Sequence, residues 1–478
     1  AAAPAAPAPL EALLVGACLA LGAAGAAFLA WPSLADGPGA PFASKAARND
    51  DATLCRPPKV ACQHREMGSL AFVVNMFADL APAGFLPVAY GAVDTGYVPA
   101  FALLTAFCAL CVFTMWLTSQ TASITGKTSY ADQWALVIGE RTRWVPVAVI
   151  TVVCFGCNLA YACFYADIFE RVMPSLGFEL PRWLCCVAFS AFPTLPLCLL
   201  KDFSALAPSS SFAVLAVLYA VAVMVVRAVD GTYAPGGTYY GTLLKELRPE
   251  VPASHLWGFG LPALSFVNSL AIAFLAHYNA CKYYRELKSH SPARFVRVTG
   301  VAMSICCLVF GISLVAGFQT FGTNCQAVIL RNYSRQDVPV NVARLAVALS
   351  LVASYPLMFS GLREALLELL GILAPARAER LGLAWVQDGL SLAAVGVITI
   401  CAVLLEDAGI VVGFVGAVCG NAVIYVIPCV LFVASVRSGL VDEGHFLLQR
   451  GFAVVLAVLG VALMIAGSVT TFLAALPP

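Results

Sequence analysis

Charge is scarce in this sequence. Lys, Arg, Asp and Glu make up only 11% of the 478 residues, hydrophobic residues make up 61%, and the mean hydropathy is +0.88. These values lie far outside the range of soluble globular proteins. The formal net charge is +1, so no general basic character would attract nucleic acid. The composition therefore predicts an integral membrane protein without a nucleic-acid partner.

The signatures of common enzyme classes are also missing. The sequence has no HExxH, no Cys/His cluster at zinc spacing, no GxxxxGK[ST] phosphate loop and no GxSxG elbow. Two cysteine pairs, Cys108/Cys111 and Cys154/Cys157, do have CxxC spacing. Both pairs lie inside apolar runs, where cysteine behaves as a small hydrophobic residue. We therefore expect no enzyme, and cysteines that pack helices.

What the sequence has in abundance is long apolar runs. A helix needs about 20 apolar residues to span the hydrocarbon core, with its backbone hydrogen bonds made internally. Twelve runs approach this length, at residues 10–31, 68–91, 97–119, 144–170, 183–200, 205–227, 257–281, 295–319, 340–361, 385–405, 408–435 and 450–475. They predict an all-α, multi-spanning membrane protein.

The distribution of Lys and Arg predicts the orientation. Basic residues gather in the loops 120–143 and 282–297, which should therefore be cytoplasmic. The segments 228–256 and 320–338 then lie on the outer side, and the core that begins at residue 67 starts in the cytoplasm. An N-glycosylation motif, Asn332-Tyr333-Ser334, agrees with this assignment, because it can be used only on the outer side.

Residues 1–66 are predicted to form a separate Ala/Pro-rich segment. Its apolar run, 10–31, has no basic residues in front of it, so a cleaved signal peptide fits poorly. Two interpretations remain open, namely an extra membrane helix followed by a cytoplasmic linker, and an Ala-rich targeting segment. The main transmembrane domain is expected at residues 67–478.

The run 68–91 carries an acidic residue, Asp79, followed by Pro82, Gly84 and Pro87. A carboxylate at membrane depth is costly and is a functional candidate by default. Proline removes a backbone donor, so the helix should break at Ala81–Gly84. Unpaired backbone groups at that depth survive only inside protein or beside a polar cavity. The alternative is a proline kink in which Asp79 is paired for stability alone.

A second run, 257–281, is interrupted in a similar way. It has Gly260 and Pro262 near its start and Ser269 in its middle. The first and sixth spans of the core are thus both discontinuous and lie five apart. This spacing is typical of transporters built from two inverted repeats, which bind substrate between their broken helices.

Seven motifs, in order along the chain, resemble those of the amino acid/auxin permease family, especially its sodium-coupled neutral amino acid transporter branch. They are GFLPVAYGAVDTG (84–96), TGKTSY (125–130), FGCNLAYACFYAD (155–167), LCLLKDFSALAPSSSFAVL (197–215), AHYNACKYYRELK (276–288), RLAVALSLVASYPLMFSGLREAL (344–366) and GFVGAVCGNAVIYVIP (413–428). The resemblance implies a LeuT-type fold of eleven helices, the first ten in two inverted five-helix repeats, with a possible extra N-terminal helix.

The resemblance also implies where the substrate binds. The expected substrate-binding residues are Asp79, Ala81, Pro82, Ala83, Gly84, Asn158, Tyr161, Ser269 and Ala273. In this set, the backbone of Ala81–Gly84 would meet the substrate carboxylate and amine. The stretch from Ser269 to Ala273 would complete the pocket, and Asn158 and Tyr161 would line it unless they serve only in packing.

A sodium site is implied at Asp79, Ser350 and Ser354, of which Ser354 matches a hydroxyl position that the family's sodium site uses. Sodium-coupled relatives have Asn where this chain has Ala78, so the coupling ion stays open. Asp79 can ligate sodium, take up a proton, or receive the amino group of a basic substrate. The two serines can instead bond to their own helix. A disulfide to Cys325, seen in some relatives, cannot form because residues 228–256 contain no cysteine.

The sequence thus predicts a secondary transporter of neutral amino acids, coupled to sodium or protons and needing no other cofactor. It would work by alternating access in the plasma membrane or a vacuolar or lysosomal membrane. An amino-acid sensor with little transport is one alternative, and a structural or channel-like bundle is another.

Overall fold

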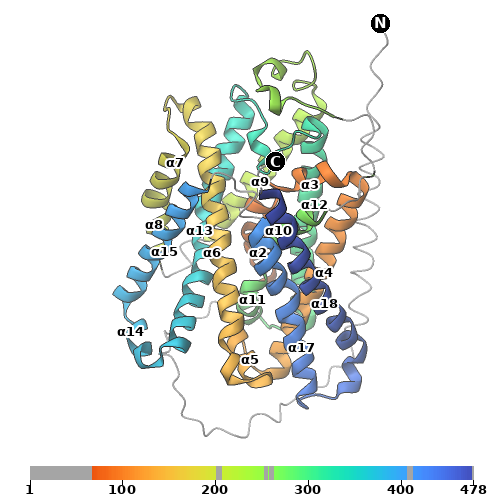
Figure 1. Cartoon of the computed structure of the whole chain (residues 1–478), viewed down its shortest axis with the longest axis vertical. Coiled ribbons are helices and arrows are strands. Elements are labelled where there is room, and N and C mark those ends of the chain that lie inside the picture. The colour runs from red at the N-terminus through yellow and green to blue at the C-terminus, as the bar shows by residue number, and fades with distance from the viewer. Residues whose placement is uncertain (1–66, 201–206, 252–256, 258–262, 406–412, 476–478) are drawn as a thin grey trace.

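The computed structural model describes residues 67–200, 207–251, 257, 263–405 and 413–475. Within these ranges the regular elements are all helices (Figure 1). Nine helical segments of the described residues are long and apolar enough to cross a membrane. The expected all-helical, multi-spanning fold class is therefore confirmed. The predictions for residues 1–66 lie outside the described residues.

The α-helices coincide with the apolar runs from residue 68 onward, except for two short ones at residues 130–137 and 378–381, which lie between runs. They are α2 (Ser69–Gly84), α3 (Val88–Thr95), α4 (Tyr97–Thr125), α5 (Tyr130–Val137), α6 (Trp144–Val172), α7 (Arg182–Phe189), α8 (Leu195–Leu199), α9 (Ala207–Val229), α10 (Ala263–Ala273), α11 (Ala280–Glu286), α12 (Pro292–Phe321), α13 (Val338–Leu373), α14 (Ala378–Leu381), α15 (Ala384–Leu404), α17 (Ile427–Arg437) and α18 (Leu447–Ala475). The first and sixth expected spans are absent from the nine because each is interrupted.

Shorter helical segments join or extend these helices. The 3-10 segments are η2 (Glu140–Thr142), η3 (Met173–Leu176), η6 (Tyr240–Thr242), η7 (Lys245–Leu247), η8 (His277–Asn279), η9 (Ile329–Arg331), η10 (Pro375–Arg377) and η13 (Glu443–Phe446). The π-helical segments are η4 (Ser190–Thr194), η11 (Val415–Gly420) and η12 (Ala422–Val426).

Local sequence explains where several helices begin and end. The side chains of Ser129, Ser291 and Asp337 cap α5, α12 and α13 by accepting hydrogen bonds from backbone amides of the first turns. Such caps satisfy amides that have no partner inside the helix. After α4, Gly126 takes a left-handed conformation with φ 66°, which glycine adopts without steric cost.

The core lies where α6 and α13 pack against each other, and α2, α4 and α12 pack close by. These helices bury most of their apolar stretches, whereas α15 and α18 bury only 22% of theirs within the protein. In Figure 1, α7, α8 and α15 form one flank, and α17 and α18 lie toward the other. The exposed apolar faces of such outer helices suit contact with lipid.

The first span breaks between α2 and α3, at residues 85–87. The predicted position of the break, Ala81–Gly84, is wrong by a few residues, because these residues form the last turn of α2. The amide of Phe85 closes that turn on the carbonyl of Ala81 at 3.2 Å. Pro82 is tolerated inside α2 because the carbonyl that its missing N–H would have bonded, that of Ala78, has another donor.

The sixth span breaks at residues 274–276, between α10 and η8. The discontinuity that the sequence predicted in this span is confirmed. The residues that suggested it, Gly260 and Pro262, lie outside the described residues, and the described break comes later, directly after Ala273.

The loops gather at two ends of the bundle as the charge pattern predicts. At one end, Thr242 and Ser334 join their hydroxyls at 2.7 Å, so the segments 228–256 and 320–338 lie together. At the other end, the amide of Gln133 on α5 reaches the thiol of Cys281 at 3.8 Å. The relative placement of the loops agrees with the predicted sidedness, although which end is cytoplasmic stays a prediction.

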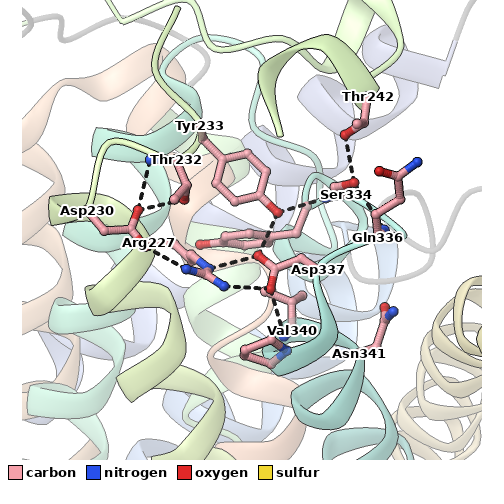
Figure 2. Close-up of polar contacts among 12 residues, drawn as sticks. Arg227, Asp230, Thr232, Tyr233, Thr242, Ser334, Gln336, Asp337, Val340 and Asn341 are labelled. Carbon is pink, nitrogen blue, oxygen red and sulfur yellow. Dashed lines mark hydrogen bonds and ion pairs between the residues drawn. The ribbon is translucent and has the colours of Figure 1, made fainter. Parts of the chain in front are cut away.

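A cluster of charged and polar groups holds the predicted outer end together (Figure 2). Arg227, at the end of α9, donates two hydrogen bonds of 2.8 Å to the buried carboxylate of Asp337, which caps α13. The hydroxyl of Tyr233 donates to the same carboxylate at 3.0 Å. Beside them, burial acts to raise the pKa of Asp230, but hydrogen bonds from Thr232 and the pairing with Arg227 outweigh it and leave that pKa below its usual value.

The glycosylation motif lies inside this end of the protein. Asn332 is 0% exposed, and Tyr333 and Ser334 are also buried. The Asn332 side chain donates to the carbonyl of Asn324 at 2.7 Å and accepts from the amide of Gln326 at 2.9 Å. Both ends of the amide are therefore engaged in shaping the loop, and the motif gives no support to the orientation.

We predict that Asn332 carries no glycan in the folded protein, because a glycan would displace two buried hydrogen bonds. The measurement is the electrophoretic mobility of protein from eukaryotic cells before and after N-glycosidase treatment, and no shift is expected. A matched control is Gly236→Asn, which creates an Asn-Gly-Thr motif at an exposed position of the same end.

The control variant should shift on treatment if that end faces the lumen or the outside. A shift of the native protein would contradict the buried position of Asn332. A control that fails to shift would contradict the predicted sidedness instead.

Candidate functional site

The buried carboxylate of Asp79 is the centre of the candidate site. Asp79 lies in α2, six residues before the break begins at Phe85, and is only 4% exposed. Its Oδ1 accepts a hydrogen bond of 2.7 Å from the hydroxyl of Tyr278, and its Oδ2 accepts one of 3.2 Å from Tyr283. Tyr278 lies in η8 and Tyr283 in α11, so the carboxylate joins the two broken spans.

Two further hydroxyls hold the backbone of the same turn. The hydroxyl of Tyr161, from α6, donates to the carbonyl of Asp79 at 2.9 Å. The hydroxyl of Ser354, from α13, donates to the carbonyl of Ala78 at 3.2 Å. Consecutive carbonyls of α2 are thus bound by side chains from two other helices. The site therefore connects both broken spans to the central helix pair α6 and α13.

The two serines of α13 make different contacts, although they lie four residues apart. Ser350 donates to the carbonyl of Val347 in its own helix at 2.8 Å, which is the alternative that the sequence left open. Ser354 instead reaches across to α2. The structure therefore brings Ser354 to the carbonyl of Ala78, next to Asp79 in the chain, and leaves Ser350 bonded to its own helix.

The two breaks lie close together at Gly84, which has no side chain to separate them. A β-carbon added at Gly84 would lie 3.1 Å from the carbonyl oxygen of Ala273 and 2.5 Å from the ring of Phe310. The absence of a side chain at Gly84 therefore lets the end of α2 lie against the end of α10. The predicted substrate-binding residues Ala81, Pro82 and Ala83, like Gly84 and Ala273, are buried here.

The side-chain amide of Asn158 in α6 is hydrogen-bonded at its nitrogen but not at its oxygen. Its Nδ2 donates to the carbonyl of Cys154 at 2.7 Å, whereas its Oδ1 is buried without a hydrogen-bond partner among the described residues. Such an acceptor is costly unless a ligand or water donates to it. Ser269, the other predicted polar residue, lies in α10 and is partly buried.

Sequence reasoning missed Tyr278 and Tyr283, which hold the Asp79 carboxylate. Both lie in the AHYNACKYYRELK motif, which was used only as a sign of resemblance. A tyrosine just after a broken span, opposite an intramembrane carboxylate, is a signal that could have suggested the pairing. It also missed Asn421, considered below.

The cysteines take the packing role that the sequence predicts. Cys108 and Cys111 in α4, and Cys154 and Cys157 in α6, are buried free thiols. Cys154 and Cys157 contribute small apolar surface next to Asn158. They pack the helices around the site.

The arrangement can bind a cation or a proton and a zwitterion. Carboxylate, carbonyl and hydroxyl oxygens from α2, η8, α11, α6 and α13 gather around Asp79 and the adjacent backbone, and oxygen ligands suit hard cations. Half-helix ends at the two breaks offer backbone groups to the charged ends of a small ligand. These are groups of the kind that coupled transporters use.

Comparison with known proteins identifies the class. Residues 67–473 match the family described as transmembrane amino acid transporter protein. Because this match covers most of the chain, the chain belongs to the transmembrane amino acid transporter family, which is the amino acid/auxin permease family that its motifs resemble. It is an amino acid transporter and not an enzyme.

Individual relatives span most of the chain. Vacuolar amino acid transporter 5 of Schizosaccharomyces pombe is 26% identical over 425 residues, covering 83% of this chain and 93% of the relative. Putative sodium-coupled neutral amino acid transporter 11 of Mus musculus is 20% identical over 409 residues, covering 84% of each protein. A solved Na+-coupled sialic acid symporter is similar at 15% identity with a TM-score of 0.45, covering 86% of this chain and 91% of that chain.

We predict that Gly84→Ala destabilises the protein by about 1–3 kcal/mol, because the new methyl group would overlap Phe310 and crowd Ala273. The measurement is thermal unfolding in detergent. The matched control is Gly389→Ala in α15, where a β-carbon would meet nothing within 4 Å. The control should be as stable as the native protein or slightly more stable, since alanine favours helix. Equal melting temperatures for both variants would contradict the close contact at Gly84.

Proposed function

We propose that this chain carries a neutral amino acid across the vacuolar membrane, coupled to sodium or protons. The observation that carries the proposal is the buried carboxylate of Asp79, which contacts both broken spans and lies beside two hydroxyls from the central helices. A cation or proton bound to the carboxylate would compete directly with the hydrogen bonds from Tyr278 and Tyr283, which tie the first broken span to the sixth. That is the requirement for coupling an ion gradient to a conformational change.

The substrate is proposed to lie between the two breaks. The backbone of Ala81, Pro82, Ala83 and Gly84 would receive its charged end groups, opposite the stretch from Ser269 to Ala273. Asn158 and Tyr161 would border the same space from α6. The close approach of Gly84 to Ala273 and the unpartnered Oδ1 of Asn158 support this placement.

Either coupling ion fits the groups at Asp79. Sodium is supported by the cluster of oxygen atoms from Asp79, Ala78 and Ser354, to which Ser350 would add a ligand after a rotamer change. A proton is supported by the carboxylate itself, which hydroxyl donors hold within the membrane. The relative named as a sodium-coupled transporter favours the first interpretation, and the vacuolar relatives support the choice of membrane.

The sensor alternative is not favoured. The family to which the chain belongs consists of transporters by its description, and the match covers residues 67–473. A channel-like bundle would need no pair of broken helices joined by a carboxylate. Coupled transport therefore explains more of the site than either alternative.

We predict that Asp79→Asn abolishes gradient-driven accumulation of amino acid while retaining exchange. Asparagine preserves the shape of the side chain, and the hydroxyls of Tyr278 and Tyr283 can reorient, but the charge that binds a cation or proton is lost. The measurement is uptake of labelled amino acids by proteoliposomes under an imposed sodium or pH gradient. The gradient that drives the native protein identifies the ion.

The control for this experiment is Asp132→Asn, which removes an exposed carboxylate of α5. It should accumulate amino acid as the native protein does. Undiminished gradient-driven accumulation by Asp79→Asn would remove Asp79 from the coupling mechanism. Binding without uptake by the native protein under either gradient would favour the sensor.

A second prediction compares the two serines. Ser354→Ala leaves the carbonyl of Ala78 without its hydroxyl donor and should reduce ion-driven uptake about tenfold, an effect of the size expected for one buried hydrogen bond. Ser350→Ala removes a bond within α13 and should change uptake less. The measurement is the ion dependence of the initial uptake rate in each variant. Equal losses would mean that both hydroxyls serve the ion.

A further inference from the structure

The tenth span of the core has an unusual backbone. It consists of the π-helical segments η11 and η12, separated by Asn421, and continues into α17. π-Helical turns are rare and occur frequently at functional sites. The wider turn is held against α10, which ends at the sixth-span break.

Glycines make this contact close. A β-carbon at Gly416 would lie 2.1 Å from the carbonyl oxygen of Asn268, and one at Gly420 would lie 3.2 Å from the β-carbon of Ala271. Ala271 lies two residues before Ala273, the last residue of α10. Asn421 directly follows Gly420, so its backbone lies beside the last turn of α10 before the break.

Asn421 repeats the arrangement of Asn158. Its Nδ2 donates to the carbonyl of Ala417, four residues earlier, at 3.1 Å, just as the Nδ2 of Asn158 donates to Cys154. In both residues this bond fixes the amide, and the Oδ1 is left buried without a partner among the described residues. Asn421 is 0% exposed. Two helices thus present the same unpaired acceptor.

Other contacts bring the two helices to the site. A β-carbon at Gly156 in α6 would lie 2.2 Å from the side chain of Val415, so α6 touches the start of η11. Tyr425, one turn after Asn421, packs on Phe107 with ring centroids 5.6 Å apart. Phe107 also lies 6.2 Å from the ring of Phe274, the first residue of the sixth-span break.

We propose that Asn421 determines substrate selectivity, accepting a hydrogen bond from a donor on the side chain of the transported amino acid. This inference rests on the proposed substrate position between the breaks. It names the substrate class as amino acids whose side chain carries an N–H or O–H group. An aliphatic side chain of the same size would leave the Oδ1 of Asn421 buried and unpaired, and the site would therefore discriminate against it.

The test uses pairs of amino acids that match in shape and differ in polarity, namely asparagine with leucine and threonine with valine. In proteoliposomes, each is measured as a competitor of labelled substrate uptake. The native protein should prefer the polar member of each pair by about tenfold or more. Asn421→Leu should reduce that preference by about tenfold, while the aliphatic competitors bind as well as before or better.

Each result has a distinct meaning. A native protein that transports amino acids but does not distinguish the members of either pair overturns the inference, even if the variant fails to fold. A variant that loses affinity for both members equally gives Asn421 a structural role and overturns it too. The control Ser435→Ala removes a buried hydroxyl of α17 that already donates to Phe432 in its own helix, and it should keep the preference. Absence of uptake of any amino acid would instead overturn the proposed function.

Discussion

A carboxylate buried at membrane depth is the constraint on which the site depends. Asp79 would be unacceptably costly in hydrocarbon without donors, and the chain supplies them from Tyr278 and Tyr283. This requirement fixes η8 and α11 against α2. Because those segments follow the sixth-span break, the same two hydrogen bonds also place the two breaks side by side. Supplying hydrogen-bond donors to one carboxylate therefore organises the meeting point of both discontinuous spans.

The break in the first span creates a second requirement, since its carbonyls need new donors. Pro82 cannot bond the carbonyl of Ala78, and Ser354 does so instead. Within the break, Ser313 donates to the carbonyl of Phe85 and the amide of Ile329 to that of Leu86. These donors come from α13, α12 and the loop 320–338. If either half of the span moves, water, an ion or substrate must replace these donors. The broken backbone therefore links the site to the surrounding helices.

The sequence was sufficient for the spans and for singling out Asp79 as a candidate, because hydropathy and the cost of a charge in lipid are local properties. It was less accurate at the break, which follows Gly84. Pro82 removes a hydrogen bond of the helix, but hydrogen bonds from other helices, such as that of Ser354, decide whether the last turn of α2 persists. It could not find Tyr278 as the partner of Asp79, 199 residues away. Asn332 shows the same limit, because only packing reveals that its motif is buried.

In the proposed site, the unpaired acceptors would give the closed state a definite preference for its occupant. The Oδ1 atoms of Asn158 and Asn421 are buried with no partner among the described residues, and each such group costs about 1–3 kcal/mol. Water can satisfy them while the site is open, but an empty, closed site cannot. An amino acid that brings donors removes this penalty in the closed state. A substrate with such donors would then favour closure, and the empty site would resist it. Substrate recognition and the conformational change would therefore depend on the same hydrogen bonds.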